Sequence, residues 1–186
     1  MTRTLTQPAL KEWSAAIHAL LDGRQTVLLR KGGIGEKRFD VAATRFLLFP
    51  TVAHSHAERV RPEHRDLLDP AVDDSTEDAV LLRAGAQVVA AVEVHRPENL
   101  GAIAAHHIWT DESVRADRLD FRPRHRLAAL VVSAAPLAEP VRLPRTPDYR
   151  GCTSWVTVPV DPVWGPPVHS DDELDAIAEQ VRASVG

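Results

Sequence analysis

The chain has 186 residues, of which 44% are hydrophobic and 26% charged, and its formal net charge is -4. This composition predicts one globular domain with a sizeable core, and it excludes a disulfide-stapled scaffold because Cys152 is the single cysteine. The sequence has no apolar run near the roughly 18 residues of a membrane span and no secretory-signal pattern, so we expect a cytoplasmic protein without a membrane partner.

The chain begins with a predicted helix and a predicted strand. Pro8 suits a first helical turn, apolar residues recur at helical spacing as far as Leu21, and Gly23 is the expected stop. Residues 26–29 are too few for a helix and predict a buried strand. A second strand is predicted at 46–49, ended by the following proline, with room for a short strand around 39–41 between the two.

The middle of the chain predicts helical structure followed by β-structure. Residues 54–68 have a helical pattern, and the acidic, turn-rich residues 70–78 predict an exposed loop. Apolar runs on both sides of Gly85, at 80–82 and 88–94, predict a hairpin or a single bent strand. Residues 97–105 are compatible with a short helix.

The last third predicts two strands and a terminal helix. The strands are expected at 127–132 and 154–158, joined by an extended, proline-rich connection without a helix. Cys152, in that connection, is interpreted as a buried packing residue. Ser170 and Glu173 form a capping box that begins the terminal helix.

The order of these elements predicts the fold class. Because strands do not alternate regularly with helices, we expect an α+β fold with a mixed, mostly antiparallel sheet or a partly closed β-barrel, flanking helices and a C-terminal helix. A single domain is predicted over residues 1–159. The proline-rich linker and helix of residues 160–186 are expected to dock on it.

Basic residues and glycines gather between the first two predicted strands. Residues 25–65 hold eight Lys or Arg against four Asp or Glu, and residues 115–126 hold five arginines against two aspartates. The Lys-Gly-Gly-Ile-Gly turn at 31–35 offers backbone N–H groups beside cations, which suits a phosphate or another anion. Its spacing fits neither a P-loop nor a dinucleotide motif, and a tight turn with positive φ, or a merely solvated basic surface, explains it equally well.

The leading prediction for function is a nucleic-acid-binding or nucleotide-binding module. A basic cleft would contact the backbone, tryptophans would stack on bases, and salt would weaken binding. The residues assigned to this site are Arg30, Lys31, Gly32, Gly33, Lys37, Arg38, Trp109, Arg118, Ser154 and Trp155.

Two alternatives stay open. A metal-dependent phosphodiesterase or nuclease-like enzyme would use Glu36, His54 and His107 as acid–base or metal-binding groups. The histidine spacings do not match a zinc motif, so hydrogen-bonding roles are favoured and no metal site is assigned. A partner-binding protein would use the acidic terminal helix. The sequence predicts neither a cofactor nor an oligomeric state.

Five blocks of sequence between residues 9 and 155 form one pattern. They are Ala9–Trp13, Leu29–Ile34 with Glu36 and Phe39, Phe46–Thr51 with His54, His107–Thr110 with Arg118, and Tyr149–Trp155. The pattern resembles the bacterial family called domain of unknown function 1802 (DUF1802). The resemblance implies no activity, and the terminal helix lies outside it.

A fainter likeness concerns the fold. Residues 17–30 are similar to the opening of the RNA-associated ASCH and PUA-like β-barrels. Those proteins carry a glutamate two residues after the threonine, where this chain has Leu28. The likeness therefore implies a barrel-like fold and does not extend to their active-site role.

Overall fold

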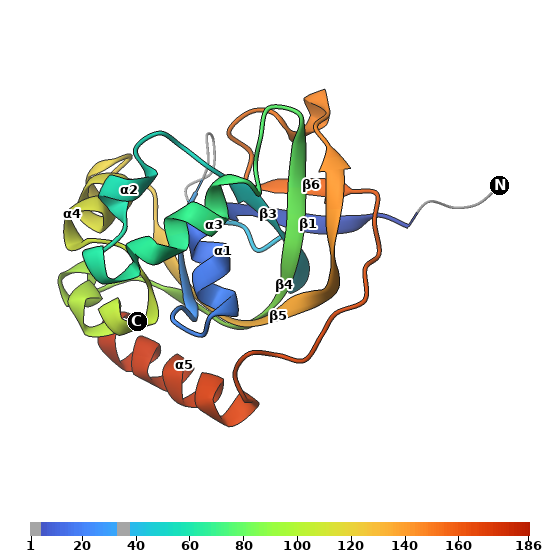
Figure 1. The fold of residues 1–186 in the computed structure, drawn as a ribbon. Coiled ribbons are helices and arrows are strands. Elements are labelled where there is room, and N and C mark those ends of the chain that lie inside the picture. The colour runs from blue at the N-terminus through green and yellow to red at the C-terminus, as the bar shows by residue number, and fades with distance from the viewer. Residues whose placement is uncertain (1–4, 33–37) are drawn as a thin grey trace.

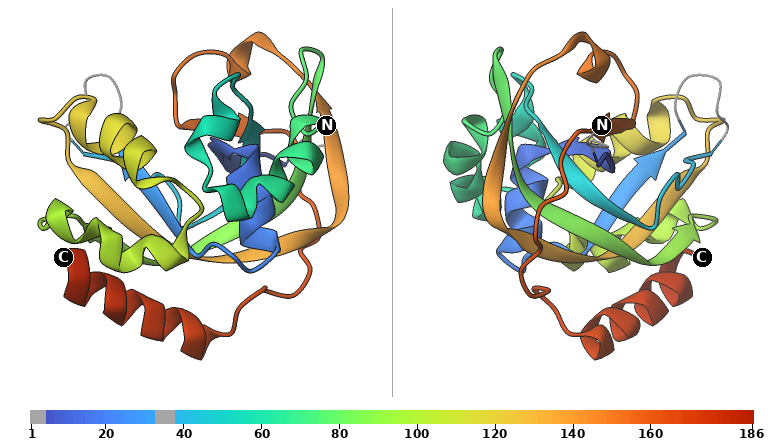
Figure 2. Two further views of the ribbon diagram at one scale, coloured as in Figure 1. Left: turned by 60° about the vertical axis from the view of Figure 1, so that its left-hand side comes forward. Right: turned by 90° about the vertical axis from the view of Figure 1, so that its right-hand side faces the viewer.

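The computed structural model describes residues 5–32 and 38–186, which form an open, strongly curved six-stranded sheet with helices around it (Figures 1 and 2). The strand order is β2-β5-β4-β3-β1-β6. Only β1 and β3 run parallel, and the other neighbouring pairs are antiparallel. The strands are β1 (Gln7–Trp13), β2 (Val27–Lys31), β3 (Arg45–Thr51), β4 (Ala79–Glu93), β5 (Leu127–Pro144) and β6 (Trp155–Val158). The predicted α+β class with a mixed, mostly antiparallel sheet is confirmed.

The first element corrects the sequence prediction. Residues predicted as the start of a helix form strand β1, and helix α1 (Ser14–Leu21) begins only after it. β1 pairs with β3 on one side and β6 on the other, so ladder hydrogen bonds on both edges outweigh the local helix preference. Gly23, with φ of 82°, follows the helix end as expected. Because these residues form a strand and not a helix, Glu12 and Trp13 lie at the C-terminal end of β1.

Apart from the short strand around 39–41, the other predicted strands are confirmed, most of them longer than expected. Pro50 lies inside β3 instead of ending it, opposite Glu12 in the parallel pair. β4 is one bent strand with irregular pairing near Leu82 and Val88. Of the two forms predicted around Gly85, the bent strand is therefore found and the hairpin is not. β5 continues well beyond residue 132 through the prolines that were expected to form a connection. The short strand around 39–41 is absent from the described residues 38–44.

Short helical segments cover one side of the sheet (Figure 1). In chain order these are α2 (His56–Arg59), η1 (Pro62–Leu67), α3 (Leu68–Val72), η2 (Pro97–His106), α4 (Asp111–Val114) and η3 (Arg115–Asp120). The single turn η4 (Pro147–Tyr149) lies apart from them, between β5 and β6 in the chain. The predicted exposed loop at 70–78 is partly wrong, because α3 extends into it and Asp74 is only 1% exposed. Asp74 is buried because its carboxylate binds His18 at 2.6 Å and Arg83 at 2.8 Å.

The C-terminal segment crosses the sheet and ends in helix α5 (Asp171–Val185). The linker is tied to β5 by backbone bonds from Gly165 N to Pro136 O at 2.7 Å and from Val168 N to Ala134 O at 2.9 Å. The helix begins with the predicted capping box of Ser170 and packs on β4, β5 and η2 (Figure 2). The domain boundary at residue 159 stays a prediction.

Two further observations bear on the sequence predictions. Cys152 is exposed instead of buried, because it lies in the turn before β6 and not in a packed strand. Over residues 5–32 and 38–186, no helix combines the length and the apolar character needed to cross a bilayer.

Candidate anion site between arginines and tryptophans

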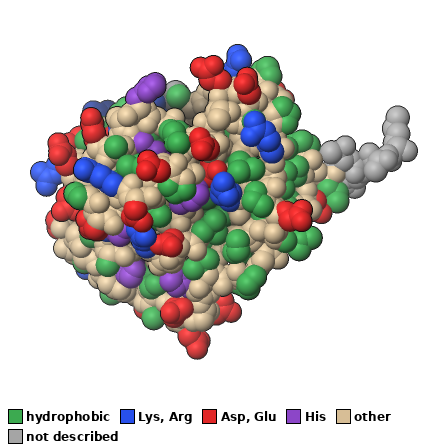
Figure 3. Space-filling model, viewed as in Figure 1, with side chains coloured by type: hydrophobic (Ala, Val, Ile, Leu, Met, Phe, Trp, Pro, Cys, Tyr) green, Lys and Arg blue, Asp and Glu red, His purple; other side chains and the backbone are tan. Residues whose placement is uncertain are grey.

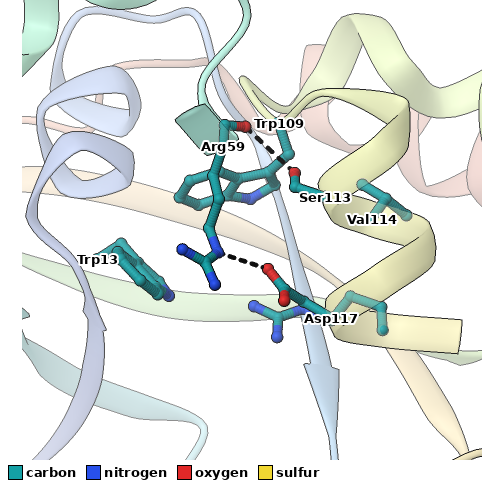
Figure 4. Close-up of a pocket in the computed structure, with 7 residues that line it drawn as sticks. Trp13, Arg59, Trp109, Ser113, Val114 and Asp117 are labelled. Carbon is teal, nitrogen blue, oxygen red and sulfur yellow. Dashed lines mark hydrogen bonds and ion pairs between the residues drawn. The ribbon is translucent and has the colours of Figure 1, made fainter. Parts of the chain in front are cut away.

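A small pocket lies where the end of β1 meets α2 and the α4–η3 segment (Figure 4). This arginine pocket is lined by Trp13, Arg59, Trp109, Ser113, Val114, Asp117 and Arg118. Its volume of about 10 Å³ is room for roughly one water molecule. A larger ligand must therefore lie at the mouth of the pocket and reach inward with a single small group.

Arg59 is held at the centre of this pocket. Its Nε donates to Asp117 Oδ2 at 2.7 Å, and its Nη1 donates to Ser55 O at 3.2 Å. The guanidinium carbon lies 5.3 Å from the centroid of the Trp13 ring, which is cation–π distance. The backbone oxygen of Arg59 accepts from Ser113 Oγ at 3.2 Å, which ties α2 to α4 (Figure 4).

A buried ion pair lies beside the pocket. Glu12 is only 3% exposed, and its Oε1 accepts from Trp13 N at 2.8 Å. Its Oε2 lies 3.3 Å from Arg30 Nη1, which also donates to Lys11 O at 3.0 Å. Arg30 comes from edge strand β2, which is not a neighbour of β1 in the sheet. Its side chain therefore bridges two strands that share no ladder.

Arg118 differs from these two arginines because its guanidinium donates no hydrogen bond within residues 5–32 and 38–186. Burial lowers its pKa, the cations of Arg30 and Arg59 lower it further, and the carboxylates of Glu12 and Asp117 act in the opposite direction. Among residues 5–32 and 38–186, three guanidiniums thus lie near two carboxylates, which is an excess of one positive charge. A partly buried cation without an acceptor is costly unless an anion joins it.

Lys31 supports the position of Arg118. Its ammonium donates to the backbone oxygens of Arg118 at 2.8 Å and Leu119 at 3.5 Å, and also to that of Phe121. Burial lowers the pKa of Lys31, followed in effect by the nearby charge of Arg118. The lysine therefore caps the carbonyls at the end of η3. Because its ammonium already donates to three backbone oxygens, it is not assigned to ligand binding.

An aromatic cluster lies at the pocket, where Trp13 and Trp109 line it and His56 packs against both rings. The rings of Trp13 and Trp109 lie 6.1 Å apart, and His56 lies 4.8 Å from Trp13 and 6.4 Å from Trp109, measured between centroids. Burial, with a smaller contribution from Arg59, lowers the pKa of His56 to about 4. This histidine is therefore neutral at physiological pH.

The structure brings together only part of the predicted binding set. Trp109 and Arg118 line the pocket, Arg30 lies beside it, and Lys31 braces it. Gly32 is buried, and its backbone oxygen lies 3.1 Å from Nδ1 of His125.

Other members of that set lie elsewhere. Ser154 and Trp155 lie at β6, where the indole Nε1 of Trp155 donates to Asp40 O at 2.9 Å and its ring stacks on Phe39. Arg38 is exposed at the start of the following segment. Gly33 and Lys37, and with them most of the glycine turn, lie outside the described residues.

Neither His54 nor His107, the two predicted acid–base residues within the described ranges, lines the pocket. His107 is 2% exposed, its Nδ1 accepts from Trp109 N at 3.1 Å, and burial lowers its pKa to about 3. His54 is exposed and lines a separate groove, and Glu36 lies outside the described residues. Within the described ranges, no three His, Cys, Asp or Glu side chains gather as a metal-binding group.

Sequence reasoning missed five polar or aromatic residues of this site, namely Glu12, Trp13, Arg59, Ser113 and Asp117. Glu12 and Trp13 were assigned to a helix, which hid their position at a strand end. The salt bridge between Arg59 and Asp117 spans 58 positions and leaves no local pattern. The usable signal was the sequence block Ala9–Trp13, which holds two of the five residues.

Solved structures show a distant likeness to one protein, ASCH from Zymomonas mobilis. Its structure is 11% identical and aligns with a TM-score of 0.45 over 96% of this chain and 95% of that one. Two structures of variants are 13% and 15% identical, with TM-scores of 0.48 and 0.46; both cover 81% of this chain, and 87% and 88% of theirs. An ASCH likeness was expected from the sequence. A search of curated proteins finds no match.

The family assignment rests on a longer match. The sequence model described as "Domain of unknown function (DUF1802)" matches residues 9–180. The match reaches into α5, which corrects the expectation that the terminal helix lies outside the resemblance. Because the match spans most of the 186 residues, the chain belongs to the DUF1802 family.

Proposed function

We propose that this protein binds a nucleic acid or a nucleotide, with a phosphate group seated at the mouth of the arginine pocket. The observation that supports this most directly is the guanidinium of Arg118, which has no acceptor in the described structure and lies near Arg30 and Arg59. A phosphate would balance the excess positive charge. Its oxygens would also accept two parallel hydrogen bonds from the guanidinium, the forked geometry that arginine favours.

The size of the pocket limits how the ligand binds. With a volume of about 10 Å³, the pocket admits a phosphate oxygen and excludes a whole nucleotide. The sugar and base must then lie outside, where the half-buried ring of Trp13 offers an aromatic surface. We assign binding and not catalysis because the acid–base candidates His54 and His107 do not line this pocket.

The proposal predicts a specific loss in the Arg118→Ala variant. Fluorescence anisotropy with labelled single-stranded RNA and DNA of about ten nucleotides should show affinity that falls with salt. Arg118→Ala should lower the affinity at least roughly tenfold and reduce the slope of log K against log salt by about 0.7, the value for one phosphate contact on a single strand.

Arg115→Ala is the matched control, since Arg115 is exposed on the same segment η3 and lies outside the pocket. It should change the affinity by less than about twofold. Absence of binding at low salt, or an equal loss in both variants, would contradict the proposal.

A further inference from the structure

A second, larger groove lies on the other side of His56. It has a volume of about 720 Å³, within the range of about 300–1,000 Å³ that small-molecule sites occupy. Its lining comes from the loop after β3, from α2 and α3, from the segment before β4 and from the residue after β5. The residues are Val52, Ala53, His54, His56, Ala57, Leu68, Asp69, Val72, Ser75, Thr76, Glu77 and Arg145. Figure 3 shows histidine and charged side chains of both signs over this helical half of the molecule.

Carboxylates outnumber cationic side chains in the lining of this groove, whereas cations are in excess at the arginine pocket. Asp69 and Glu77 are exposed carboxylates on its lining. Arg145 also lines it, but this guanidinium already donates to Thr76 O and Ser75 Oγ. A phosphate is therefore disfavoured here, whereas a neutral group with hydrogen-bond donors fits the carboxylate oxygens.

His56 supplies the second observation, a buried polar group without a partner. It is only 5% exposed, it lines the groove, and its Nε2 has no hydrogen-bond partner within the described residues. Because Nε2 has less than 1 Å² of exposed surface, the imidazole ring must turn toward the groove before a ligand can bond this nitrogen. A ligand that satisfies it then gains affinity, because a buried nitrogen without a partner is unfavourable. As a neutral imidazole it offers one donor and one acceptor.

The two sites share one wall. His56 and Arg59 lie three positions apart on α2, and Arg59 lines the arginine pocket while His56 lines the groove. The His56 ring also packs on Trp13 at 4.8 Å between centroids. One ligand could thus extend from the pocket mouth past Trp13 into the groove.

We propose that the groove is a subsite for a nucleobase that carries an exocyclic amino group; this rests on the function proposed above. Asp69 or Glu77 accepts from the amino group, His56 bonds a ring nitrogen or carbonyl, and the exposed side chains of Val52 and Val72 cover the ring face. Adenine, cytosine and guanine satisfy this chemistry. Uracil and thymine have no amino group and do not.

The test uses free nucleosides, which carry no phosphate and so report on the groove alone. Adenosine, cytidine, guanosine and uridine are titrated into the full chain, and the His56 imidazole resonances, assigned with His56→Phe, are followed by NMR. At least one amino-bearing nucleoside should shift them with millimolar affinity, and uridine should bind at least about fivefold more weakly.

Two variants test the assignment. Asp69→Asn should reduce the preference over uridine, whereas Asp73→Asn, an exposed aspartate just after α3 that does not line the groove, should preserve it.

The outcomes separate the two proposals. Nucleoside binding without oligonucleotide binding supports the groove and overturns the phosphate site. Oligonucleotide binding with no His56 shift from any nucleoside overturns the groove and leaves the phosphate site standing. Uridine binding as tightly as the best of the other three overturns the role of the carboxylates.

Discussion

Two arginine–tryptophan pairs in this molecule serve different purposes. Arg45 lies 3.7 Å from the ring centroid of Trp164, and Arg59 lies 5.3 Å from that of Trp13. Trp164 belongs to the linker that crosses the sheet, and its ring lies directly over Gly85 of β4. Backbone bonds on both sides of Trp164, from Ala138 N to Val163 O and from Gly165 N to Pro136 O, complete this contact.

The Trp13 pair has a different environment. Around it lie three guanidiniums and two carboxylates, and Arg118 donates no hydrogen bond within the described part of the chain. The linker contact is thus complete within the protein, while the described side chains of the arginine pocket include one more cation than carboxylates. We infer that the first pair contributes to stability and the second to binding, and each prediction below tests one side of this contrast.

The largest effect is expected at Gly85. A Cβ there would lie 2.2 Å from Cζ2 of Trp164, so any side chain displaces the indole and the linker. Gly85→Val should lower the free energy of unfolding by about 3 kcal/mol in chemical denaturation. Oligonucleotide affinity of the folded variant should stay unchanged.

A double-mutant cycle tests the cause of that loss. In a Trp164→Ala background the same glycine substitution should cost much less, because its steric partner is gone. Equal losses of unfolding free energy in both backgrounds would show that the contact with Trp164 is not what requires glycine at position 85.

The second effect is a loss of stability at acidic pH, caused by two buried histidines. His56 and His107 have folded pKa values of about 4 and about 3, lowered by burial from the ordinary value of 6.5. The unfolded chain therefore binds more protons than the folded one, and stability falls as the pH decreases below about 6.5. Each histidine should contribute a loss of about 2 kcal/mol between pH 7 and pH 5.

His107→Asn isolates one of these contributions. Its amide oxygen can still accept from Trp109 N, as His107 Nδ1 does at 3.1 Å, but the side chain does not titrate. Unfolding measured at pH 7 and pH 5 should show a smaller difference for this variant than for the original chain. An unchanged difference in stability between pH 7 and pH 5 would show that His107 does not contribute to the pH dependence.

The smallest effect is expected at the cap of α5. Ser170 Oγ accepts from Glu173 N at 3.3 Å, and a Glu173 carboxylate oxygen accepts from Ser170 N at 2.9 Å. Ser170→Ala should lower the free energy of unfolding by about 1 kcal/mol, measured by thermal or chemical denaturation. A change in oligonucleotide affinity would contradict the assignment of the C-terminal segment to stability alone.

The contrast also shows what the sequence could predict. Local patterns were sufficient for most strands and for the capping box at Ser170, because the determining residues are neighbours in the chain. β1 was assigned wrongly because its conformation is determined by pairing with β3 and β6, which are distant in sequence. Arg118 and Trp109 were found by residue type. Arg59 and Asp117 were missed because only the fold joins them.

The central claim is that Arg118, whose guanidinium donates no hydrogen bond to any residue that the structure describes, binds a phosphate, whereas Arg45 packs on the linker. The most direct measurement compares Arg118→Ala with Arg45→Ala for binding of one single-stranded RNA at low salt, with the stability of both variants measured in parallel. Arg118→Ala should lose at least about tenfold in affinity and keep its stability, while Arg45→Ala should lose about 1 kcal/mol of stability and keep its affinity. The same loss of affinity in both variants, or none in Arg118→Ala, would contradict the account.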